Sequence, residues 1–545
     1  MKKILMSALA AFMLFAFGCS KQQNECKIST EDFANATSEN VALFATYSMD
    51  AEFVKETTDQ KGVKEFFEEL SKNKKIQEAL NECIGAITQE TGQNFIKIDF
   101  INKILLKSAN AKEAFFFGAS IDELSENANM KLIIDSPLAV ELFEDFVESA
   151  KDELKLQKSQ KDGISVYKTD DVAIIVKGNI ISVAKNEETA IALIKNIKTP
   201  AEKPFAKTPK FAKLTSIKKD ANFICFIDAK EEEKSFSEIF ISAKYYSPSE
   251  FGMTFKIELG KDAIAEVKDT FKMFAQRTLP NNFLLKNSVK DSSVAFAAAI
   301  PEISDKVSEL ASLMMADNLE ASKIAIQMLK SIGLKSVCFS CGELKAEQIL
   351  KIQETMQPPE MFLKIDCENA DAFFKNPMVS QMLNTPFISQ MQFGENSIYT
   401  TMANIKFAPI ANTGAFISTI PDLSKTMSLA KNSGESLADN KDAVQILSRL
   451  ASGNQIELYL NGNKFKDLLQ EINKMQMKQI EELSDSDINS AAKSYLAMNE
   501  FMNDITKKSQ MAMSLKIEDF AVIINCEAVQ DIDYEKAVQI LKELK

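Results

Sequence analysis

The order of strands and helices expected in residues 40–276 recurs in residues 292–545, and this repetition is the strongest constraint on the fold. Each half opens on an apolar strand, NVALFATYSM at 40–49 and SSVAFAAAIP at 292–301. Amphipathic helical segments, further strands with helices between them, and two adjacent strands with a closing helix then follow in the same order in both halves. Agreement over this many consecutive segments predicts two tandem homologous units.

The strand segments alternate apolar and polar residues, as in SVYKTDDVAIIVKGNIISVAK at 165–185. Such alternation is typical of antiparallel sheets with one covered face. Gly178 stands in a tight-turn pair with asparagine, and Gly252 and Gly394 are expected between strands. Asp422 is expected to cap a helix. The fold class is therefore α+β, in which each unit is an antiparallel, meandering sheet with packed amphipathic helices.

The expected organisation has a short leader, a tether and two units. Pro280 and the two asparagines after it place a boundary between the units. The parts are a signal peptide (1–18), a lipidated cysteine with a flexible tether (19–39), a first unit (40–276), a linker (277–291) and a second unit (292–545) with a helical hairpin insertion (463–507).

Three segments of the chain resemble a known family. They are the opening strand VALFATY, the hairpin VAIIVKGNIISVAKN, and the segment PFAKTPKFAKLTSIKKDANFICFIDA. The sequence is similar here to a family of large bacterial envelope proteins, often lipoproteins, with tandem α+β repeats and no characterised function. The resemblance implies the repeated fold over most of the chain, and it implies no active site.

The N-terminus, MKKILMSALAAFMLFAFGCS, has the pattern of a secretory signal. Two lysines precede an apolar run at 4–17, which is shorter than the roughly 20 residues of a membrane-spanning helix. Gly18 and Cys19 resemble the end of a bacterial lipoprotein box, so Cys19 is expected to be acylated and to become the first residue of the mature protein. The alternative is an ordinary cleaved signal with an incidental cysteine. In that family Ser20 favours the outer membrane of a diderm bacterium.

The composition excludes several classes of function. The chain has no histidine, which rules out Ser-His-Asp and Cys-His triads and histidine-ligated zinc. Glycine is scarce, at 16 residues, so a glycine-rich phosphate loop is not expected, and a net charge of −13 argues against nucleic acid as a partner. We therefore expect no cofactor, no metal and no catalytic residues.

The motif CFSC at Cys338 and Cys341 allows a redox or a metal interpretation. It lies in SVCFSCGE, which is predicted to be a strand, whereas a redox motif of this spacing normally opens a helix. A second such motif, which a four-cysteine zinc site needs, is missing. Two buried structural cysteines are the favoured interpretation.

Other chemical patterns are weak. Asp170 and Asp171 are expected in a turn between strands. Asp485 and Asp487 begin an EF-hand spacing that lacks its glycine and its final glutamate, so a helix cap is favoured over calcium. SLAK at 428–431 and SIKK at 216–219 match a Ser-x-x-Lys spacing without the rest of that motif set.

The segment FKDLLQEINKMQMKQIEEL at 465–483 predicts an amphipathic helix, and a second helix rich in methionine and aromatic residues follows it. Methionine-rich helices can line adaptable binding grooves, although an ordinary core face has the same pattern. The candidate residues for binding a ligand or partner are Phe465, Leu469, Met475, Met498 and Phe501.

The expected function is that of a membrane-anchored envelope lipoprotein, held in the bilayer through Cys19, which binds an envelope protein or polymer without catalysis. The alternative is a periplasmic carrier or chaperone of a lipid or another apolar ligand. A glycan hydrolase that uses only carboxylates is the third possibility, and the lack of tryptophan platforms disfavours it.

Overall fold

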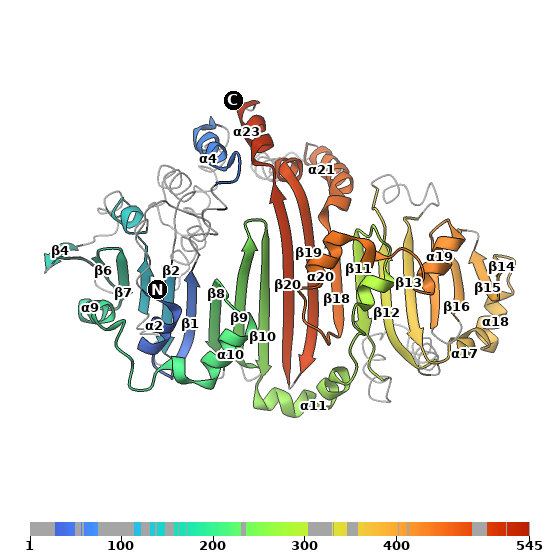
Figure 1. Ribbon diagram of the computed structural model, residues 1–545, viewed down its shortest axis with the longest axis horizontal. Helices are drawn as coiled ribbons and strands as arrows, with labels where there is room; N and C mark the ends of the chain where they lie inside the picture. The colour runs from blue at the N-terminus through green and yellow to red at the C-terminus, as the bar shows by residue number, and fades with distance from the viewer. Residues whose placement is uncertain are drawn as a thin grey trace. The chain divides into compact units, whose positions relative to one another are not determined.

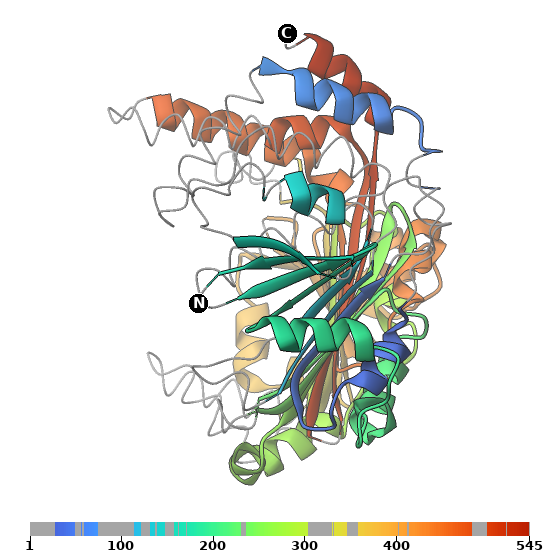
Figure 2. The ribbon, with the colours of Figure 1, turned by 90° about the vertical axis from the view of Figure 1, so that its left-hand side faces the viewer.

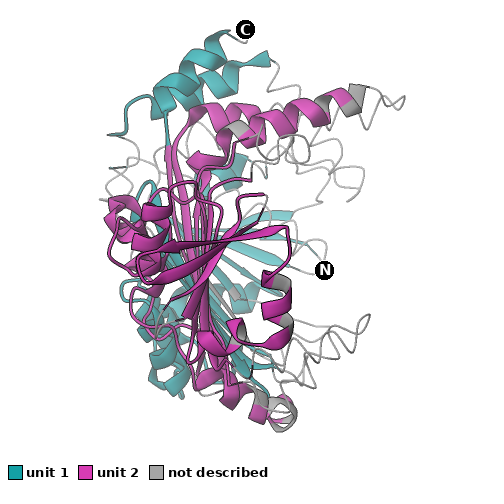
Figure 3. Cartoon of the chain, turned by 90° about the vertical axis from the view of Figure 1, so that its right-hand side faces the viewer, with its two compact units in different colours: residues 1–260, 532–545 teal, residues 261–531 magenta. Residues whose placement is uncertain are grey.

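The fold comes from a computed structural model of the chain. It describes residues 28–48, 56, 59–74, 114–120, 131–136, 139–145, 147, 157–161, 163–169, 172–229, 236–302, 330, 332–345, 358–401, 403–410, 414–481, 499–518 and 520–543. The chain forms two compact units, coloured separately in Figure 3. Unit 1 comprises residues 1–260 and 532–545, and unit 2 comprises residues 261–531.

The described strands of unit 1 form one antiparallel sheet, in the order β4-β5-β6-β7-β3-β2-β1-β8-β9-β10 (Figure 1). They are β1 (Val41–Ser48), β2 (Ala114–Ser120), β3 (Lys131–Asp135), β4 (Gln157–Lys161), β5 (Ile164–Lys168), β6 (Ala173–Lys177), β7 (Ile180–Ala184), β8 (Phe223–Asp228), β9 (Phe236–Ser247) and β10 (Glu250–Leu259).

The described strands of unit 2 form an antiparallel sheet in the order β14-β15-β16-β17-β13-β12-β11-β18-β19-β20. They are β11 (Val294–Ala299), β12 (Leu334–Cys341), β13 (Met361–Cys367), β14 (Ile388–Phe393), β15 (Asn396–Thr401), β16 (Lys406–Ile410), β17 (Gly414–Ser418), β18 (Ile456–Asn461), β19 (Thr506–Glu518) and β20 (Ala521–Ile532). Strand for strand, this order is the same as that of unit 1. The α+β class and the antiparallel sheets are thus as predicted.

The core of unit 1 is aromatic. Phe44 of β1 lies opposite Phe226 of β8, and Phe33 stacks on Phe44 with ring centroids 5.4 Å apart. Helices that carry Phe33 and Leu214 cover this part of the sheet from one side (Figure 2). Among the described residues, the main helical elements of the unit are α2 (Thr30–Ala36), α4 (Val63–Lys72), residues 139–145, α9 (Glu187–Asn196), the 3-10 turn η1 (Phe205–Lys207), α10 (Pro209–Ile217) and α23 (Tyr534–Glu543).

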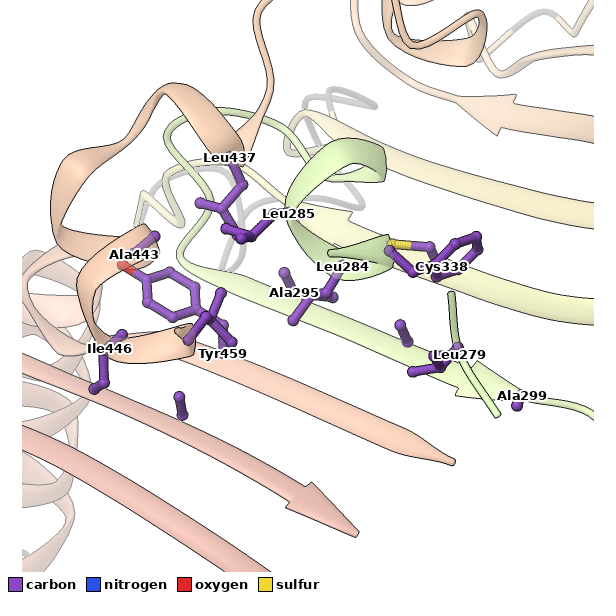
Figure 4. Packing of buried hydrophobic residues seen from close by; sticks show 14 of the residues in the cluster. Leu279, Leu284, Leu285, Ala295, Ala299, Cys338, Leu437, Ala443, Ile446 and Tyr459 are labelled. Atoms are coloured by element: carbon purple, nitrogen blue, oxygen red, sulfur yellow. The ribbon is translucent and has the colours of Figure 1, made fainter. Parts of the chain in front are cut away.

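The core of unit 2 has smaller side chains on the strands and larger ones on the helices. Ala295 of β11 lies opposite Tyr459 of β18, and Leu284 and Leu285 pack against this pair from α12 (Figure 4). The described helical elements of the unit are α11 (Lys261–Ala275), α12 (Phe283–Asn287), α17 (Ala370–Phe374), α18 (Pro377–Leu383), α19 (Leu423–Ala430), η3 (Leu437–Asp439), α20 (Lys441–Leu447), η4 (Gly462–Phe465), α21 (Lys466–Glu481) and residues 499–505.

Two segments expected to lie outside the units, the tether and the linker, contribute residues to the cores. The prediction of a tether is wrong for residues 28–36, because α2 begins there with a capping box at Ser29 and buries Phe33. The expected linker 277–291 contains α12, which buries Phe283 and its neighbours in the core of unit 2. Each sheet is therefore preceded in the chain by a short helix that packs on it.

The compact units also differ from the predicted boundaries at two helices. Helix α11 was expected to close the first unit, but it groups with unit 2. Helix α23 was expected to close the second unit, but it groups with unit 1, where it packs on α4. Gly252 lies within β10 rather than in the turn before it, whereas Gly178 and Gly394 do occupy turns with positive φ.

Within the described residues, no helix is both long and apolar enough to cross a membrane.

Candidate functional site

Four of the residues predicted to bind a ligand or partner lie among the described residues: Phe465, Leu469, Met475 and Phe501. Cys19 and Met498 lie outside the described residues. Phe465 ends η4 and is half-buried, as is Phe501 in the helical turn before β19. Leu469 and Met475 lie on α21 with 41% and 44% of their surface exposed.

The cysteines of CFSC lie in β12, as predicted, and both are buried. Burial raises the pKa of Cys338 to about 12 and that of Cys341 to about 11. The Sγ atom of Cys338 lies 3.4 Å from Oγ of Ser288, and at 3.6 Å it donates to the carbonyl oxygen of Asn287. A thiol that stays protonated in this way is a packing residue and not a nucleophile.

A row of three carboxylates crosses the sheet of unit 1. Asp228 of β8 lies opposite Glu238 of β9, which in turn lies opposite Glu258 of β10. Directly opposed residues of neighbouring strands share a face of the sheet, so the three side chains stand side by side. Acids in a row across three strands are the kind of arrangement that catalysis or metal binding uses.

Two lysines of α10, together with Lys256 of β10, pair with this row. Lys210 Nζ lies 2.8 Å from Asp228, and Lys213 Nζ lies 2.8 Å from Glu258. Both also reach Glu238, at 3.5 and 3.7 Å. The same ammonium groups stand 5.0 Å from the ring centres of two phenylalanines of the sheet. The cluster therefore fastens α10 to the sheet, and the described residues contain no acid or cysteine group suited to a metal ion.

Unit 2 contains a buried lysine. Lys364 of β13 is 3% exposed, and its Nζ donates to Oδ1 of Asn287 at 2.6 Å and to Oδ1 of Asn432 at 3.1 Å. Burial lowers the pKa of Lys364, and the charge of Asp366 opposes that shift. Burial likewise raises the pKa of Asp366, opposed by Lys364. Cys338 lies opposite Lys364 in the register. With its ammonium group bonded to side-chain amides, this lysine holds α12 and the end of α19 to the sheet.

The edge strand of unit 2, β14, has a different character. It pairs only with β15 among the described strands, and residues 389–393 are all exposed. Phe387, directly before the strand, is 67% exposed, and Met391 and Phe393 are 46% and 38% exposed. Met391 lies opposite Ile398, which is fully buried in the unit 2 core, so an apolar core face continues outward onto an uncovered strand.

The corresponding edge strand of unit 1, β4, is polar. Its sequence is QKSQK, with Lys158 placed over the ring of Tyr167 at 5.2 Å from the centroid. Lysines are a common protection of exposed sheet edges against pairing with other chains. In unit 1, Lys158 of β4 lies opposite Tyr167 of β5. In unit 2, the residue of β14 that lies opposite Tyr399 of β15 is the uncharged Gln390.

Sequence reasoning did not single out β14. The signal that was available is its lack of charge: the segment TPFISQMQFG at 385–394 contains no acidic or basic residue in a chain that is 26% charged. That segment also has the β-propensity of a strand with two phenylalanines.

A groove lies between α4 and α23 within unit 1, with a volume of about 480 Å³. Its walls carry lysines and glutamates that are paired with one another, Lys61 with Glu535 at 2.7 Å and Lys542 with Glu65 at 2.6 Å. These pairs join α23 to α4 and to the turn before it.

No family model and no curated protein matches the sequence. One solved structure, described as "Structure of crystal form I of TP0453", aligns with a TM-score of 0.24 and 12% sequence identity, over 42% of this chain and 79% of that one. A TM-score this low supports no inference about fold or function.

Proposed function

We propose that this chain is a bacterial envelope lipoprotein, anchored in the membrane through Cys19, that acts as a non-catalytic binding or scaffold protein. In a diderm host its place is the outer membrane. The sequence pattern at residues 1–20 supports the anchor, because two or three acyl chains give stable attachment. The identical strand order of the two sheets supports its origin as two copies of one unit.

The observation that best supports binding without catalysis is a contrast within the described residues. The clustered charged groups are engaged internally, as in the row of Asp228, Glu238 and Glu258 with its lysines. Exposed apolar surface, in contrast, gathers around an uncovered strand edge at β14. Exposed apolar side chains next to unpaired backbone groups are characteristic of protein contact surfaces.

The carrier alternative is less well supported. It needs an apolar cavity, and the groove between α4 and α23 is lined by paired charges. We therefore retain the binding and scaffold function as the proposal.

Metabolic labelling with an alkyne fatty acid tests the anchor. The full chain is expected to carry the label, and Cys19→Ser is expected to lose it and to leave the membrane fraction. Cys26→Ser is the matched control and is expected to keep the label. Retention of label in Cys19→Ser contradicts the anchor at this residue.

Site-specific photo-crosslinking in the intact envelope tests binding. A photoreactive phenylalanine analogue at position 387 is expected to give a covalent adduct with a macromolecule. The same analogue at Lys158, on the polar edge of unit 1, is expected to give none. Absence of any adduct from position 387 and from Met391, Leu469 and Met475 contradicts a binding function.

A further inference from the structure

We propose that β14 pairs with the β14 strand of a second copy of this chain, antiparallel and centred on Gln390, so that two copies join through unit 2 about a two-fold axis. This inference rests on the proposed binding function and names its partner. It depends on three observations: a backbone edge open for pairing, a sequence that complements itself, and a corresponding strand in unit 1 that lacks this complementarity.

The open edge follows from the hairpin that β14 forms with β15. Phe393 and Asn396 flank a two-residue turn, Gly394–Glu395, and pair with each other. In such a hairpin the flanking pair is hydrogen-bonded and pairs alternate along the ladder, so Gln390 and Gln392 direct their N–H and C=O groups away from β15. No strand of the described chain lies on that side. The backbone N–H and C=O groups of these two alternate residues are therefore free to pair with another strand.

The sequence of this edge matches itself in reverse. If two β14 strands pair about a two-fold axis perpendicular to the sheet, residues that lie opposite each other have their side chains on the same face. This requires that the pairing be centred on one residue, which then lies opposite its own copy. When the pairing of the segment FISQMQF at 387–393 is centred on Gln390, Phe387 of each copy lies opposite Phe393 of the other. This aromatic pair therefore occurs at both ends of the paired strands. Two exposed aromatic side chains at each end become cross-strand pairs, which stabilise antiparallel pairing.

The charges favour a second copy as the occupant. No charged residue lies between Thr385 and Gly394, so pairing of two copies brings no like charges together. The side-chain amide of Gln390 can donate a hydrogen bond to Gln390 of the other copy and accept one from it. The edge β4 of unit 1 would bring Lys158 and Lys161 of both copies into one ladder. Like charges on directly paired strands are unfavourable, so the dimer forms through unit 2 and not through unit 1.

The test measures the mass of the full, acylated chain in detergent by sedimentation and native mass spectrometry. Wild type is expected to be a dimer. Gln390→Lys and Gln390→Glu each place two like charges on the two-fold axis and are expected to weaken the dimer by about ten-fold or more. An equimolar mixture of the two variants is expected to recover dimer as the mixed species. Lys158→Glu is the matched control on β4 and is expected to dimerise as wild type does.

Each outcome bears on the proposal. A monomeric wild type overturns it, as does a dimer that Gln390→Lys leaves intact. Failure of the mixture to form the heterodimer overturns the register centred on Gln390. A monomeric wild type with an adduct from position 387 to another envelope protein removes the second copy as partner and keeps the binding function. Absence of dimer together with absence of adduct removes both.

Discussion

Lys364 is a cation buried where the first unit has an aliphatic side chain. Ile133 stands two residues before Asp135, which ends β3, and Lys364 stands two residues before Asp366 near the end of β13; both are buried. The lysine is tolerated because Oδ1 of Asn287 in α12 and Oδ1 of Asn432 after α19 accept hydrogen bonds from its ammonium group. A buried charge with good partners fixes how neighbouring elements meet more than it adds to stability.

Replacing Lys364 by methionine is expected to lower the free energy of unfolding by about 1–3 kcal/mol, because Oδ1 of the buried Asn287 loses its donor. Urea unfolding of the full chain, followed by hydrogen exchange in β13, measures the change. Lys425→Met is the control, since that lysine is about half exposed in a surface pair with Glu360 and its loss is expected to cost less than about 1 kcal/mol. Equal effects of the two variants would contradict the role given to Lys364.

The thiol of Cys338 is expected to be unreactive in the folded chain. Its pKa is raised to about 12 by burial, against 9.0 for an exposed thiol, so maleimide at pH 8 is expected to modify it only after unfolding. Between pH 9 and pH 12 the thiol of Cys338 is protonated in the folded state and deprotonated in the unfolded state. The stability that it contributes is therefore fully present below pH 9 and is lost as the pH rises toward 12. Peptide mass spectrometry and alkaline unfolding curves, compared with Cys338→Ala, test both statements.

At the scale of elements, α10 is held to its sheet by charge pairs that lie over aromatic rings. Lys213→Met keeps the aliphatic stem on Phe240 but removes the nearer of the two lysines paired with Glu258, since Lys256 remains 3.6 Å away, and it is expected to cost about 1 kcal/mol. In the presence of Glu258→Gln the cost is expected to be smaller, because the carboxylate charge that Lys213 pairs with is gone, and 1 M salt is expected to reduce it. A double-mutant cycle by thermal unfolding measures this coupling.

The control for that cycle is Lys203→Met, which removes only an exposed pair with Glu39 and is expected to have no measurable effect. A coupling between Lys213 and Glu258 that is indistinguishable from zero would show that the cluster does not hold the helix.

The elements that sequence reasoning found are those with strong periodicity. Alternation predicted the hairpins of β5 to β7 and β15 to β17, and capping predicted α19 at Asp422, whose side chain accepts from the backbone of Lys425. Helices α2 and α12 have seven and five residues, too few for a helical period to stand out, and Ser29 and Pro280 resemble loop residues. Their burial is set by tertiary packing, which sequence patterns do not contain.

The candidate site was predicted only in part. The structural role of the cysteines followed from their place in a strand, because a strand buries both faces of a central position. Pairing of Lys213 with Glu258, 45 residues apart, depends on a register that no local pattern specifies. The exposed edge of β14 was missed because exposure depends on which strands end the sheet.

At the scale of the whole molecule, the two units have the same strand order but different core side chains. Phe44 in unit 1 corresponds to Ala295 in unit 2, and the two lie opposite Phe226 and Tyr459 in their sheets. Leu284 and Leu285 of α12 belong to the same buried cluster as Ala295. Cores tolerate different side chains at matching positions when the total volume is kept, so one strand order is compatible with both sets of residues.

The two helices that follow the sheets are assigned to the opposite units, and this has a measurable consequence. Helix α23 packs on α4 of unit 1 through the fully buried Leu541, and Asn73 donates to the carbonyl oxygen of that residue at 3.0 Å.

Leu541→Ala is expected to destabilise unit 1 by about 2–5 kcal/mol, since it leaves a cavity in that contact. Hydrogen exchange should accelerate in residues 63–72, although they lie some 470 positions away, and should stay unchanged in β11 to β13. Lys542→Ala, which removes only an exposed pair with Glu65, is expected to leave both regions protected. Faster exchange confined to unit 2 would mean that the last helix stabilises the sheet it follows, and that the units are closed sequentially along the chain.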